Sequence, residues 1–312
     1  MVIKVEGRTI VKYPAKPEKR KLSKAARREE IIGYLFLLPN MVGFFIFTLI
    51  PVVYGLLLSL TNYDGFGNMN FLGLKNFKKL FTDVYFYTAL KNNIYYTVFS
   101  VTFTLLFGLL LAVLLQRKLR GSNLFKTIFF FPQLTSSVAF GIIFVCLFRG
   151  SGPINGVLQT LGMNNPPKWL TSTDWSMTTI TIVSIIKNFG YYMVLFIAGL
   201  QTIPADLYEA SAIDGANGWR QFKAITLPML SPTTFLCSIM CLINSFKVFD
   251  LVNIMTDGGP GRSSNVFVYR IYQEAFVKYN FGYASAYAVV LFFIVFVITM
   301  IQFRGQKKWV NY

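Results

Sequence analysis

The sequence predicts an all-α polytopic membrane protein with six transmembrane helices. The 312-residue chain is 54% hydrophobic and only 14% charged, and its mean hydropathy is +0.51, far more apolar than a soluble domain of this size. Apolar runs of about 20 residues, the length that crosses the hydrocarbon core as a helix, recur along the chain. Their apolar character is continuous and does not alternate, which favours helices over barrel strands. The predicted spans are 31–60, 93–115, 128–148, 177–200, 233–254 and 283–303.

The spans divide the chain into a membrane domain with a short segment on either side. The first apolar run is too long for the h-region of a cleavable signal peptide, so we expect it to remain as an anchor. It contains Pro39 and Pro51, and we expect it to start with an interfacial or kinked portion. The predicted parts are a basic N-terminal arm at 1–30, a transmembrane domain at 31–303 with a polar loop at 204–228, and a C-terminal tail at 304–312.

The basic residues sort by side of the membrane. The net charge of +17 taken alone would suggest a nucleic-acid partner. With the N-terminus inside, however, the segments on that side carry 19 Lys and Arg residues and the outer segments carry 9. The positive-inside rule therefore predicts a multi-pass protein of the cell membrane with both termini in the cytoplasm. Anionic headgroups of the lipid bilayer account for the basic arm, so we expect no nucleic-acid partner.

No group of residues in the sequence indicates an enzyme active site or a metal centre. The chain has no His, and its three cysteines, Cys146, Cys237 and Cys241, lie within predicted spans, where we interpret them as small packing residues. An integral membrane enzyme would need paired carboxylates or an activated nucleophile, and the acidic residues are scattered singly. An ion-coupled secondary transporter fits poorly because we find no inverted repeat. We therefore expect no catalytic residue, no metal and no cofactor on this chain.

Three segments are predicted on the outer side of the membrane. In the first, 61–90, glycines mark turns and residues 75–86 are predicted to form a short surface helix. In the second, 149–175, Gly-Pro and Asn-Pro-Pro sequences predict ordered turns. The third follows the fifth span and begins with the glycine-rich stretch 257–261.

The polar loop 204–228 between the fourth and fifth spans is the most informative segment. Pro204 suits the first residue of a helix, because its missing N–H would be unbonded there anyway, and Gly215 is predicted to end that helix in a left-handed conformation. A second short helix is expected to begin near Asn217 and to end before Pro228, since the residue before a proline disfavours helical geometry. Two such helices predict a rigid knob on the cytoplasmic face for docking another protein; an ordinary inter-helix loop is the alternative.

The spacing of residues in this loop resembles the EAA motif of importer-type ABC transporter permeases, the MetI-like group. The motif residues are Glu209-Ala210-Ser211, Asp214-Gly215-Ala216, Ile225 and Leu227-Pro228, with Ser211 in place of the second alanine. The resemblance covers nearly the whole chain, including Gly152-Pro153-Ile154-Asn155 and Gly258-Gly259-Pro260. Within the family, the chain is similar to the carbohydrate branch, which contains permeases for maltose, glycerol-3-phosphate and oligosaccharides. The resemblance implies a type I ABC importer permease architecture and a subunit that translocates a sugar or oligosaccharide.

In that family the EAA loop is the coupling helix, which sits in a cleft of a separate ATPase. The resemblance implies that Glu209 pairs with a basic residue of the ATPase and that Gly215 allows the bend. The chain has no GxxxxGK[ST] phosphate loop, so ATP and magnesium are expected on the partner subunit. The implied ATPase-coupling residues are Glu209, Ala210, Ser211, Ala212, Asp214, Gly215 and Phe222, of which Ala210, Ala212 and Phe222 would pack in the cleft.

The resemblance also implies the other members of an importer. They are a second, homologous permease subunit, two copies of the ATPase and an extracytoplasmic solute-binding protein that delivers the sugar. The outer loops, especially 152–175 and 258–281, are where a binding protein would land.

Polar side chains within spans are costly, which makes them candidates for a solute pathway. Four such residues recur at helical spacing in the fourth span, and three more lie near the middle of the fifth span or beyond it. They supply hydrogen bonds, and Phe189 and Tyr192 nearby supply aromatic rings, the combination that sugars require. Interhelical hydrogen bonding or snorkelling is the alternative for each. The candidates are Ser184, Lys187, Asn188, Tyr191, Asn244, Ser245 and Lys247.

Two of these candidates leave the charge of the solute open. A buried ammonium group on Lys187 or Lys247 favours a negative partner, which would fit an anionic solute such as a uronate or a sugar or glycerol phosphate. Asp250 offers an internal partner instead, because it follows Lys247 by three residues and can pair with it on one helix face. Neutral and anionic solutes both remain open.

Overall fold

The computed structural model describes residues 2–5, 8–11, 24–67, 69–116, 121–307 and 310. Part of the predicted basic arm lies outside the described residues, with several of its basic residues. Four more of the basic residues counted above also lie outside them, Arg117, Lys118, Arg120 and Lys308. The chain forms two compact units, Met1–Tyr54 and Gly55–Tyr312, which are described separately below.

The first unit contains a hairpin and most of a long apolar helix. Strands β1 (Val2–Val5) and β2 (Arg8–Val11) pair antiparallel, and the sequence prediction contains no such hairpin. Helix α1 (Lys24–Phe44) runs into the π-helical turn η1 (Phe45–Leu49) and then into α2 (Ile50–Leu58), which continues into the second unit.

The second unit is almost entirely helical over its described residues. The predicted surface helix 75–86 is present as its first helix but ends at Thr82, four residues earlier. The elements of this unit are α3 (Lys75–Thr82), α4 (Val84–Gln116), α5 (Ser122–Leu134), α6 (Ser137–Phe148), α7 (Pro153–Thr160), α8 (Ser176–Gln201), α9 (Ala205–Ile213), α10 (Gly218–Gln221), η2 (Phe222–Thr226), α11 (Leu227–Met229), α12 (Ser231–Phe246), α13 (Asp250–Thr256), α14 (Phe267–Tyr272), η3 (Gln273–Val277) and α15 (Phe281–Gln306).

The described residues hold five helical stretches that are long and apolar enough to cross a membrane. A sixth span results if the two helices Gly218–Met229 and Ser231–Phe246, bent by 64° at their junction, cross together. The count agrees with the six spans predicted. The five stretches are Arg27–Leu58, Val84–Gln116, Ser137–Thr160, Ser176–Gln201 and Phe281–Gln306.

Two of the π-helical turns end two residues before a proline, η1 before Pro51 and η2 before Pro228. In η2 the backbone N–H of Leu227 donates to the carbonyl of Phe222, five residues back. A proline has no N–H and its ring crowds the preceding turn, and a widened turn accommodates it without ending the helix. The prediction that the helix ends before Pro228 is therefore wrong, because α11 includes this residue and the bend follows at Leu230.

Two of the predicted spans are broken. The span predicted at 128–148 is interrupted at 135–136, between α5 and α6, shortly after Pro132. The span predicted at 233–254 is interrupted at 247–249, between α12 and α13. A helix broken at membrane depth leaves backbone N–H and C=O groups that need partners, so such a break must lie against protein or line a cavity.

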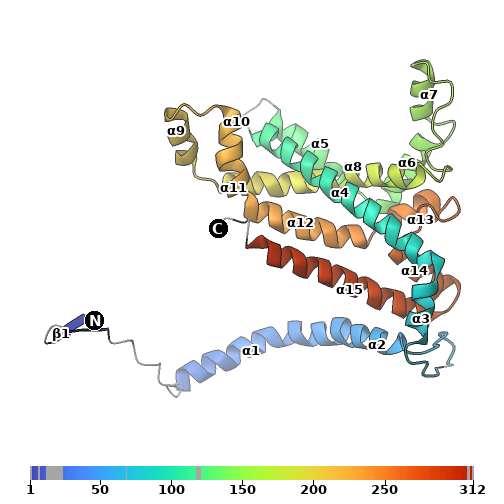
Figure 1. The fold of residues 1–312 in the computed structure, drawn as a ribbon, viewed down its shortest axis with the longest axis horizontal. Coiled ribbons are helices and arrows are strands. Elements are labelled where there is room, and N and C mark those ends of the chain that lie inside the picture. Colours follow the sequence, from blue (N-terminus) through green and yellow to red (C-terminus); the bar gives the residue numbers. More distant parts are fainter. Residues whose placement is uncertain are drawn as a thin grey trace. The chain divides into compact units, whose positions relative to one another are not determined.

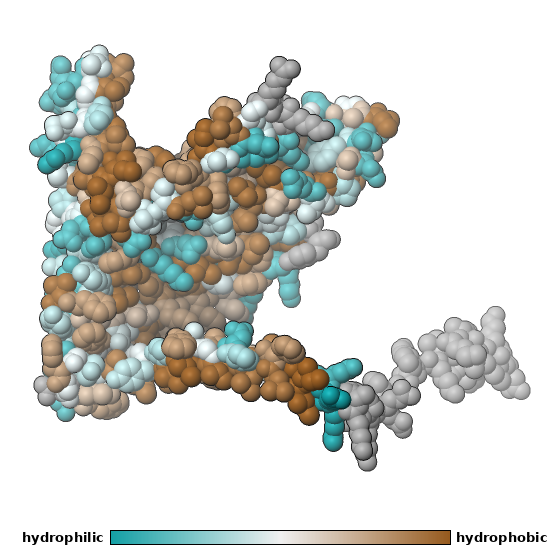
Figure 2. Space-filling model, turned by 180° about the vertical axis from the view of Figure 1, so that it is seen from behind, coloured by the Kyte–Doolittle hydropathy of each residue, from teal (hydrophilic) through white to brown (hydrophobic). Residues whose placement is uncertain are grey.

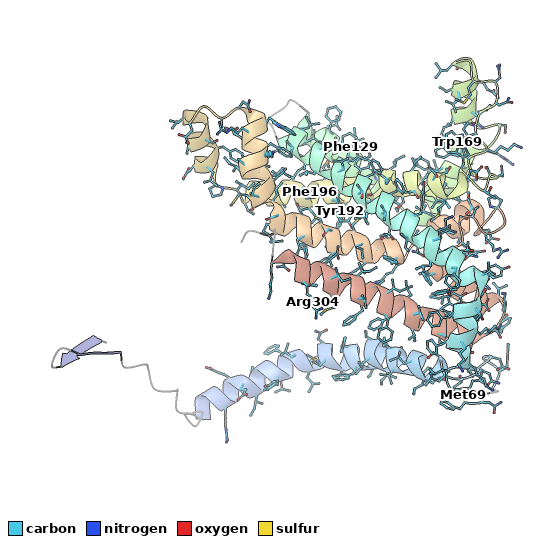
Figure 3. All side chains as sticks on the ribbon, in the orientation of Figure 1. Met69, Phe129, Trp169, Tyr192, Phe196 and Arg304 are labelled. Atoms are coloured by element: carbon cyan, nitrogen blue, oxygen red, sulfur yellow. The ribbon has the colours of Figure 1, made fainter. Side chains whose placement is uncertain are left out.

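Helix α8 is the central helix of the second unit and packs against α4 and α5 (Figure 1). Two glycines allow these close contacts. A Cβ on Gly190 of α8 would collide with the carbonyl oxygen of Phe129 in α5, and a Cβ on Gly108 of α4 would lie 3.1 Å from the backbone nitrogen of Met193. Tyr192 of α8 and Phe129 belong to the apolar core formed there (Figure 3).

Away from this core, the second unit exposes many large apolar side chains (Figure 2). Phe103 and Phe107 on α4 and Phe293 and Phe296 on α15 are each more than a third exposed. A soluble protein rarely exposes apolar surface of this extent, whereas lipid tails match it. The surface of the unit therefore agrees with a membrane protein.

The two ends of the second unit carry different elements. Figure 1 shows α9 and α10 at one end, together with the start of α5 and the end of α15, and shows α3, α7, α13 and α14 at the other. The polar loop and the predicted outer segments thus lie at opposite ends of the helices.

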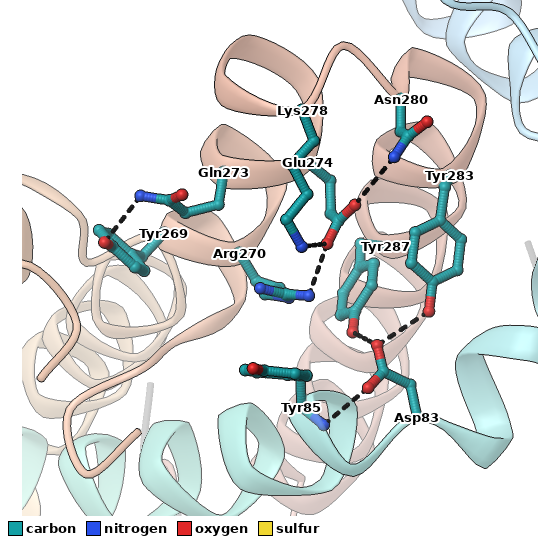
Figure 4. A network of polar contacts seen from close by, with 10 residues as sticks. All are labelled: Asp83, Tyr85, Tyr269, Arg270, Gln273, Glu274, Lys278, Asn280, Tyr283 and Tyr287. Carbon is teal, nitrogen blue, oxygen red and sulfur yellow. Dashed lines mark hydrogen bonds and ion pairs between the residues drawn. The ribbon is translucent and has the colours of Figure 1, made fainter. Parts of the chain in front are cut away.

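A polar network joins the α3–α4 corner to α15 (Figure 4). The carboxylate of Asp83 accepts hydrogen bonds from the Tyr283 hydroxyl at 3.0 Å and the Tyr287 hydroxyl at 2.9 Å. It also accepts one from the backbone N–H of Tyr85 at 2.8 Å. Burial alone would raise the pKa of this carboxyl, but these three hydrogen bonds and the nearby positive charge of Arg270 outweigh it and hold the pKa below its ordinary value of 3.8.

The same network reaches α14 and η3. Arg270 and Glu274, both buried, form an ion pair at 2.5 Å, and Lys278 donates to the same carboxylate at 2.8 Å. The Arg270 guanidinium lies 4.0 Å from the ring centre of Tyr85. These contacts tie α14 to the start of α4.

We expect Asp83→Asn to lower the free energy of unfolding at pH 7 by about 1 kcal/mol, because the hydrogen bonds to a charged acceptor become neutral ones. A carboxyl whose pKa is depressed by folding stabilises the protein above its unfolded pKa, and this contribution is lost as the pH falls through the folded value. The difference in melting temperature between wild type and variant should therefore persist at neutral pH and shrink as the pH falls below 3.8, the ordinary pKa of the group.

Asp174→Asn is the matched control, since its carboxylate is exposed. An equal loss of melting temperature for both variants at pH 7 would contradict a stabilising role for the Asp83 network.

Candidate functional site

Both helix breaks open onto one cavity of about 380 Å³ in the second unit. Residues from α4, α8 and α12 line it, as do Gln133 and Ser137 on either side of the first break and 247–249 at the second. The cavity thus lies where continuous helix is missing from two spans. All seven residues predicted for the solute pathway line it, namely Ser184, Lys187, Asn188, Tyr191, Asn244, Ser245 and Lys247.

Hydrogen bonds between helices and within α8 fix several of these side chains. The hydroxyls of Ser184 and Tyr96 lie 2.5 Å apart, and the Asn188 amide donates to the Ser184 carbonyl at 2.7 Å. Ser245 donates to Thr97 on α4 at 3.0 Å. For Ser184 and Ser245, interhelical bonding is therefore realised, and their hydroxyls form part of the frame of the cavity.

The first cavity lysine is bonded to the protein. Lys187 is 7% exposed, and its Nζ donates to the carbonyls of Thr135 at 2.8 Å and Pro132 at 3.2 Å. The same ammonium lies 5.3 Å from the ring centre of Phe140 at the start of α6. The cation therefore contacts both sides of the break between α5 and α6.

The second cavity lysine, Lys247, is not placed to pair with Asp250 on one helix face. Lys247 and Asp250 do not share a helix face, because α12 ends at Phe246 and α13 begins at Asp250. Within the described part of the chain, no ion pair joins the two side chains. Both residues are exposed and line the cavity.

The aromatic lining includes Tyr96, Tyr191, Tyr192 and Phe249. Phe189, which we expected near the solute, instead packs against Phe129 with ring centres 5.8 Å apart. The apolar ring therefore faces the α5 contact, while the tyrosines supply aromatic surface to the cavity.

Sequence reasoning missed the contribution of α4. Tyr96, Ser100 and Thr104 line the cavity, and their spacing of four residues places them on one helix face. Polar residues at this regular spacing within an apolar span are a pattern from which these lining residues could have been predicted.

The polar loop forms the predicted pair of short helices. Gly215 adopts the left-handed conformation at φ 76°, and its N–H bonds to the carbonyl of Ala212 while that of Ala216 bonds to Ser211. This is the Schellman arrangement that ends a helix. The Asn217 side chain caps the second helix by accepting from the N–H of Arg220 at 2.9 Å. The predicted stop and the predicted second start are both confirmed.

Side chains brace the two helices of the loop against each other. The Gln221 amide donates to the Ser211 hydroxyl at 2.9 Å and to the Tyr208 carbonyl at 3.2 Å. The Tyr208 hydroxyl lies 3.0 Å from that of Thr226. The serine that replaces alanine in the motif therefore ties α9 to α10, and the loop forms one braced unit.

The predicted coupling residues lie largely on the loop surface. Glu209, Ala210, Ala212 and Asp214 are exposed, and Phe222 is half-buried.

Two large apolar residues at this surface were missed by sequence reasoning. Ile213 is 87% exposed and Trp219 is 73% exposed, and Trp219 stacks on Phe222 with ring centres 5.7 Å apart.

In the part of the chain that the structure describes, no group of three metal-ligating side chains is found.

Residues 104–308, which include the loop and most of the residues that line the cavity, match the family described as binding-protein-dependent transport system inner membrane component. The chain is 34% identical over 283 residues to the probable starch degradation products transport system permease protein AmyD of Thermoanaerobacterium thermosulfurigenes, covering 89% of this chain and 95% of that protein. It is 32% identical over 287 residues to the sn-glycerol-3-phosphate transport system permease protein UgpA of Agrobacterium fabrum, covering 91% and 97%.

The fold is shared with a solved membrane protein. A chain from the crystal structure of a bacterial ABC transporter involved in the import of the acidic polysaccharide alginate matches with a TM-score of 0.81 at 23% identity, over 92% of this chain and 99% of that one. With the spans, the broken helices and the braced loop in place, these similarities show that the chain belongs to the family of binding-protein-dependent transport system inner membrane components.

Proposed function

We propose that the chain is the permease subunit of an ATP-binding cassette importer and that it translocates a sugar or oligosaccharide through the cavity. The observation that carries this proposal is the position of the cavity at two helix breaks, which is where transporters place their solute sites. Its amide, hydroxyl and tyrosine lining suits a polyhydroxylated solute. The AmyD relative, described as transporting starch degradation products, supports a saccharide.

The loop gives this subunit a means of coupling to an ATPase. Its two helices join α8 on one side and, through η2 and α11, α12 on the other, and both of these helices line the cavity. A displacement of the braced loop by a partner would therefore move two cavity walls. Such a partner shifts the transporter between conformations only by contacting them differently, and a rigid loop supplies those contacts.

The remaining partners follow from this role. A second, homologous permease subunit would complete the pathway, two ATPase copies would carry ATP and magnesium, and an extracytoplasmic binding protein would deliver the solute to the end that carries α7 and α14. The basic residues Arg220 and Lys223 at the loop, with Arg304 at the end of α15, support an orientation with the loop and both termini in the cytoplasm.

An anionic solute is the second candidate, favoured by two lysines in the cavity and by the glycerol-3-phosphate transport role named for the UgpA relative. A membrane enzyme has less support, since Asp250 is the single carboxylate among the cavity residues that the structure describes.

The solute pathway is testable through a cysteine that the chain already contains. Cys241 lines the cavity, and Cys146 is exposed on α6. In the reconstituted complex with its binding protein, we expect the transported saccharide to slow alkylation of Cys241 by N-ethylmaleimide, as followed by mass spectrometry, because solute excludes the reagent from the cavity.

Cys146 is the internal control, and its alkylation rate should not change. Equal rates at Cys241 with and without a saccharide that the complex demonstrably imports would place the pathway elsewhere.

A further inference from the structure

We propose that Lys187 is a positioning residue whose cation caps the broken third span, and that the cavity consequently selects an uncharged saccharide. This inference deepens the proposed function and rests on it.

The contacts of the Lys187 cation are those of a helix cap. The last carbonyls of a helix have no partner within it, and the C-terminal end carries partial negative charge that a cation stabilises. Nζ reaches the carbonyl of Pro132 in the last turn of α5 and that of Thr135 immediately after the helix. The ring of Phe140 in α6 covers another side of the ammonium at 5.3 Å.

A neighbouring contact on α8 explains why the cap is needed at this place. Gly190 lies one helical turn after Lys187 and lets the backbone of α5 approach α8 at Phe129. The chain of α5 then breaks a few residues further on. The Pro132 carbonyl there also accepts from the N–H and the hydroxyl of Thr135, whereas lipid or an apolar wall would leave the Thr135 carbonyl unbonded. Lys187 donates to both carbonyls from the same face of α8 and adds a cation beside the helix end. The two contacts together hold α5 against α8 and keep the break open toward the cavity.

The charged groups of the cavity are poorly placed to bind an anion. Two of the three N–H groups of Lys187 are bonded to carbonyls, and the other charged residues that line the cavity, Lys247 and Asp250, carry opposite charges. An anion that approaches Lys247 would therefore also meet a carboxylate. An uncharged sugar instead needs hydrogen-bonding amides, which Asn188, Asn244 and Gln133 supply.

The first test measures backbone exchange at the break in the assembled complex without solute. We expect Lys187→Met to raise hydrogen–deuterium exchange of residues 135–141 by about tenfold, because charge-assisted bonds to the carbonyls are lost. Lys187→Arg, which keeps donors and charge, should stay close to wild type. Lys247→Met is the matched control, since it removes a cavity lysine that does not bond to the break.

Unchanged exchange in the Lys187→Met complex would overturn the positioning role. If that variant does not assemble, Lys187→Gln replaces it, because glutamine keeps a donor without the charge. Assembly of Lys187→Arg together with failure of Lys187→Met supports the cap, since loss of a mere solute ligand would leave assembly intact.

The second test uses Cys241 alkylation to compare two probes in the wild-type complex, neutral glucose oligosaccharides and galacturonate oligosaccharides of the same lengths. We expect protection by the neutral probe alone. Protection by the acidic probe that disappears in Lys187→Met would make Lys187 an anion ligand and overturn the inference. Protection by neither probe contradicts both the selectivity and the proposed saccharide pathway, while the exchange experiment still decides the role of Lys187.

Discussion

Glu209→Lys is expected to abolish solute-stimulated ATP hydrolysis while the subunits still assemble. Glu209 lies exposed on α9, so its replacement changes folding little, within about 0.5 kcal/mol. If Glu209 pairs with a basic residue of the ATPase, charge reversal brings two like charges together, which costs on the order of several kcal/mol at an interface. The measurement is ATP hydrolysis by the reconstituted complex with binding protein and saccharide present.

Glu29→Lys is the control for this prediction, because it reverses an exposed carboxylate on α1 that belongs to neither the loop nor the outer segments. It should retain stimulated hydrolysis. Wild-type stimulation in the assembled Glu209→Lys complex would show that this carboxylate does not couple the two subunits.

Gly190→Ala is expected to destabilise the protein by about 3 kcal/mol or more, even though it adds one methyl group. The new Cβ would collide with the carbonyl oxygen of Phe129, and a backbone atom inside α5 has no rotamer by which to move aside. Relief requires α5 and α8 to separate, which disturbs the cavity between them. The melting temperature and yield of the solubilised complex measure the effect.

Gly156→Ala provides a control of opposite sign. Nothing lies within 4 Å of a Cβ at Gly156 in α7, and alanine in an open helical position is favoured over glycine by roughly 0.5–1 kcal/mol. This variant should keep or raise the melting temperature. Similar destabilisation by both alanines would mean that the α5–α8 contact is not close-packed.

The number of spans and the shape of the loop were accessible from sequence because each depends on local chemistry. Apolar length sets the spans, Gly215 permits the left-handed stop, and Asn217 supplies a cap with its own side chain. The breaks at 135–136 and 247–249 were not accessible, since apolar composition alone does not distinguish a continuous helix from a broken one.

The sequence also predicted part of the cavity, because helical periodicity is a local property. Helical periodicity brought the α8 candidates to one face, and all the predicted pathway residues line one cavity. The partner of Lys187 was missed because it is the end of a helix whose break was not foreseen, and its carbonyls belong to a segment more than 50 residues away in sequence. A polar residue in a span signals cost, but its partner becomes identifiable only when the fold is known.

The surface of the loop shows a second limit of prediction from the sequence. The motif directs attention to Glu209 and the small residues that follow it. The exposure of Ile213 and Trp219 depends on the angle between α9 and α10, which the Ser211–Gln221 brace sets. Spacing in the sequence does not give that angle.

The most direct test of the account is uptake of labelled saccharide into proteoliposomes that contain this chain, its partner permease and the ATPase. With ATP inside and the solute-loaded binding protein outside, we expect accumulation that stops when either ATP or the binding protein is left out. Absence of accumulation from a complete, ATP-hydrolysing complex across neutral and acidic saccharides, or accumulation that needs neither ATP nor binding protein, would contradict the role of this chain as a saccharide importer permease.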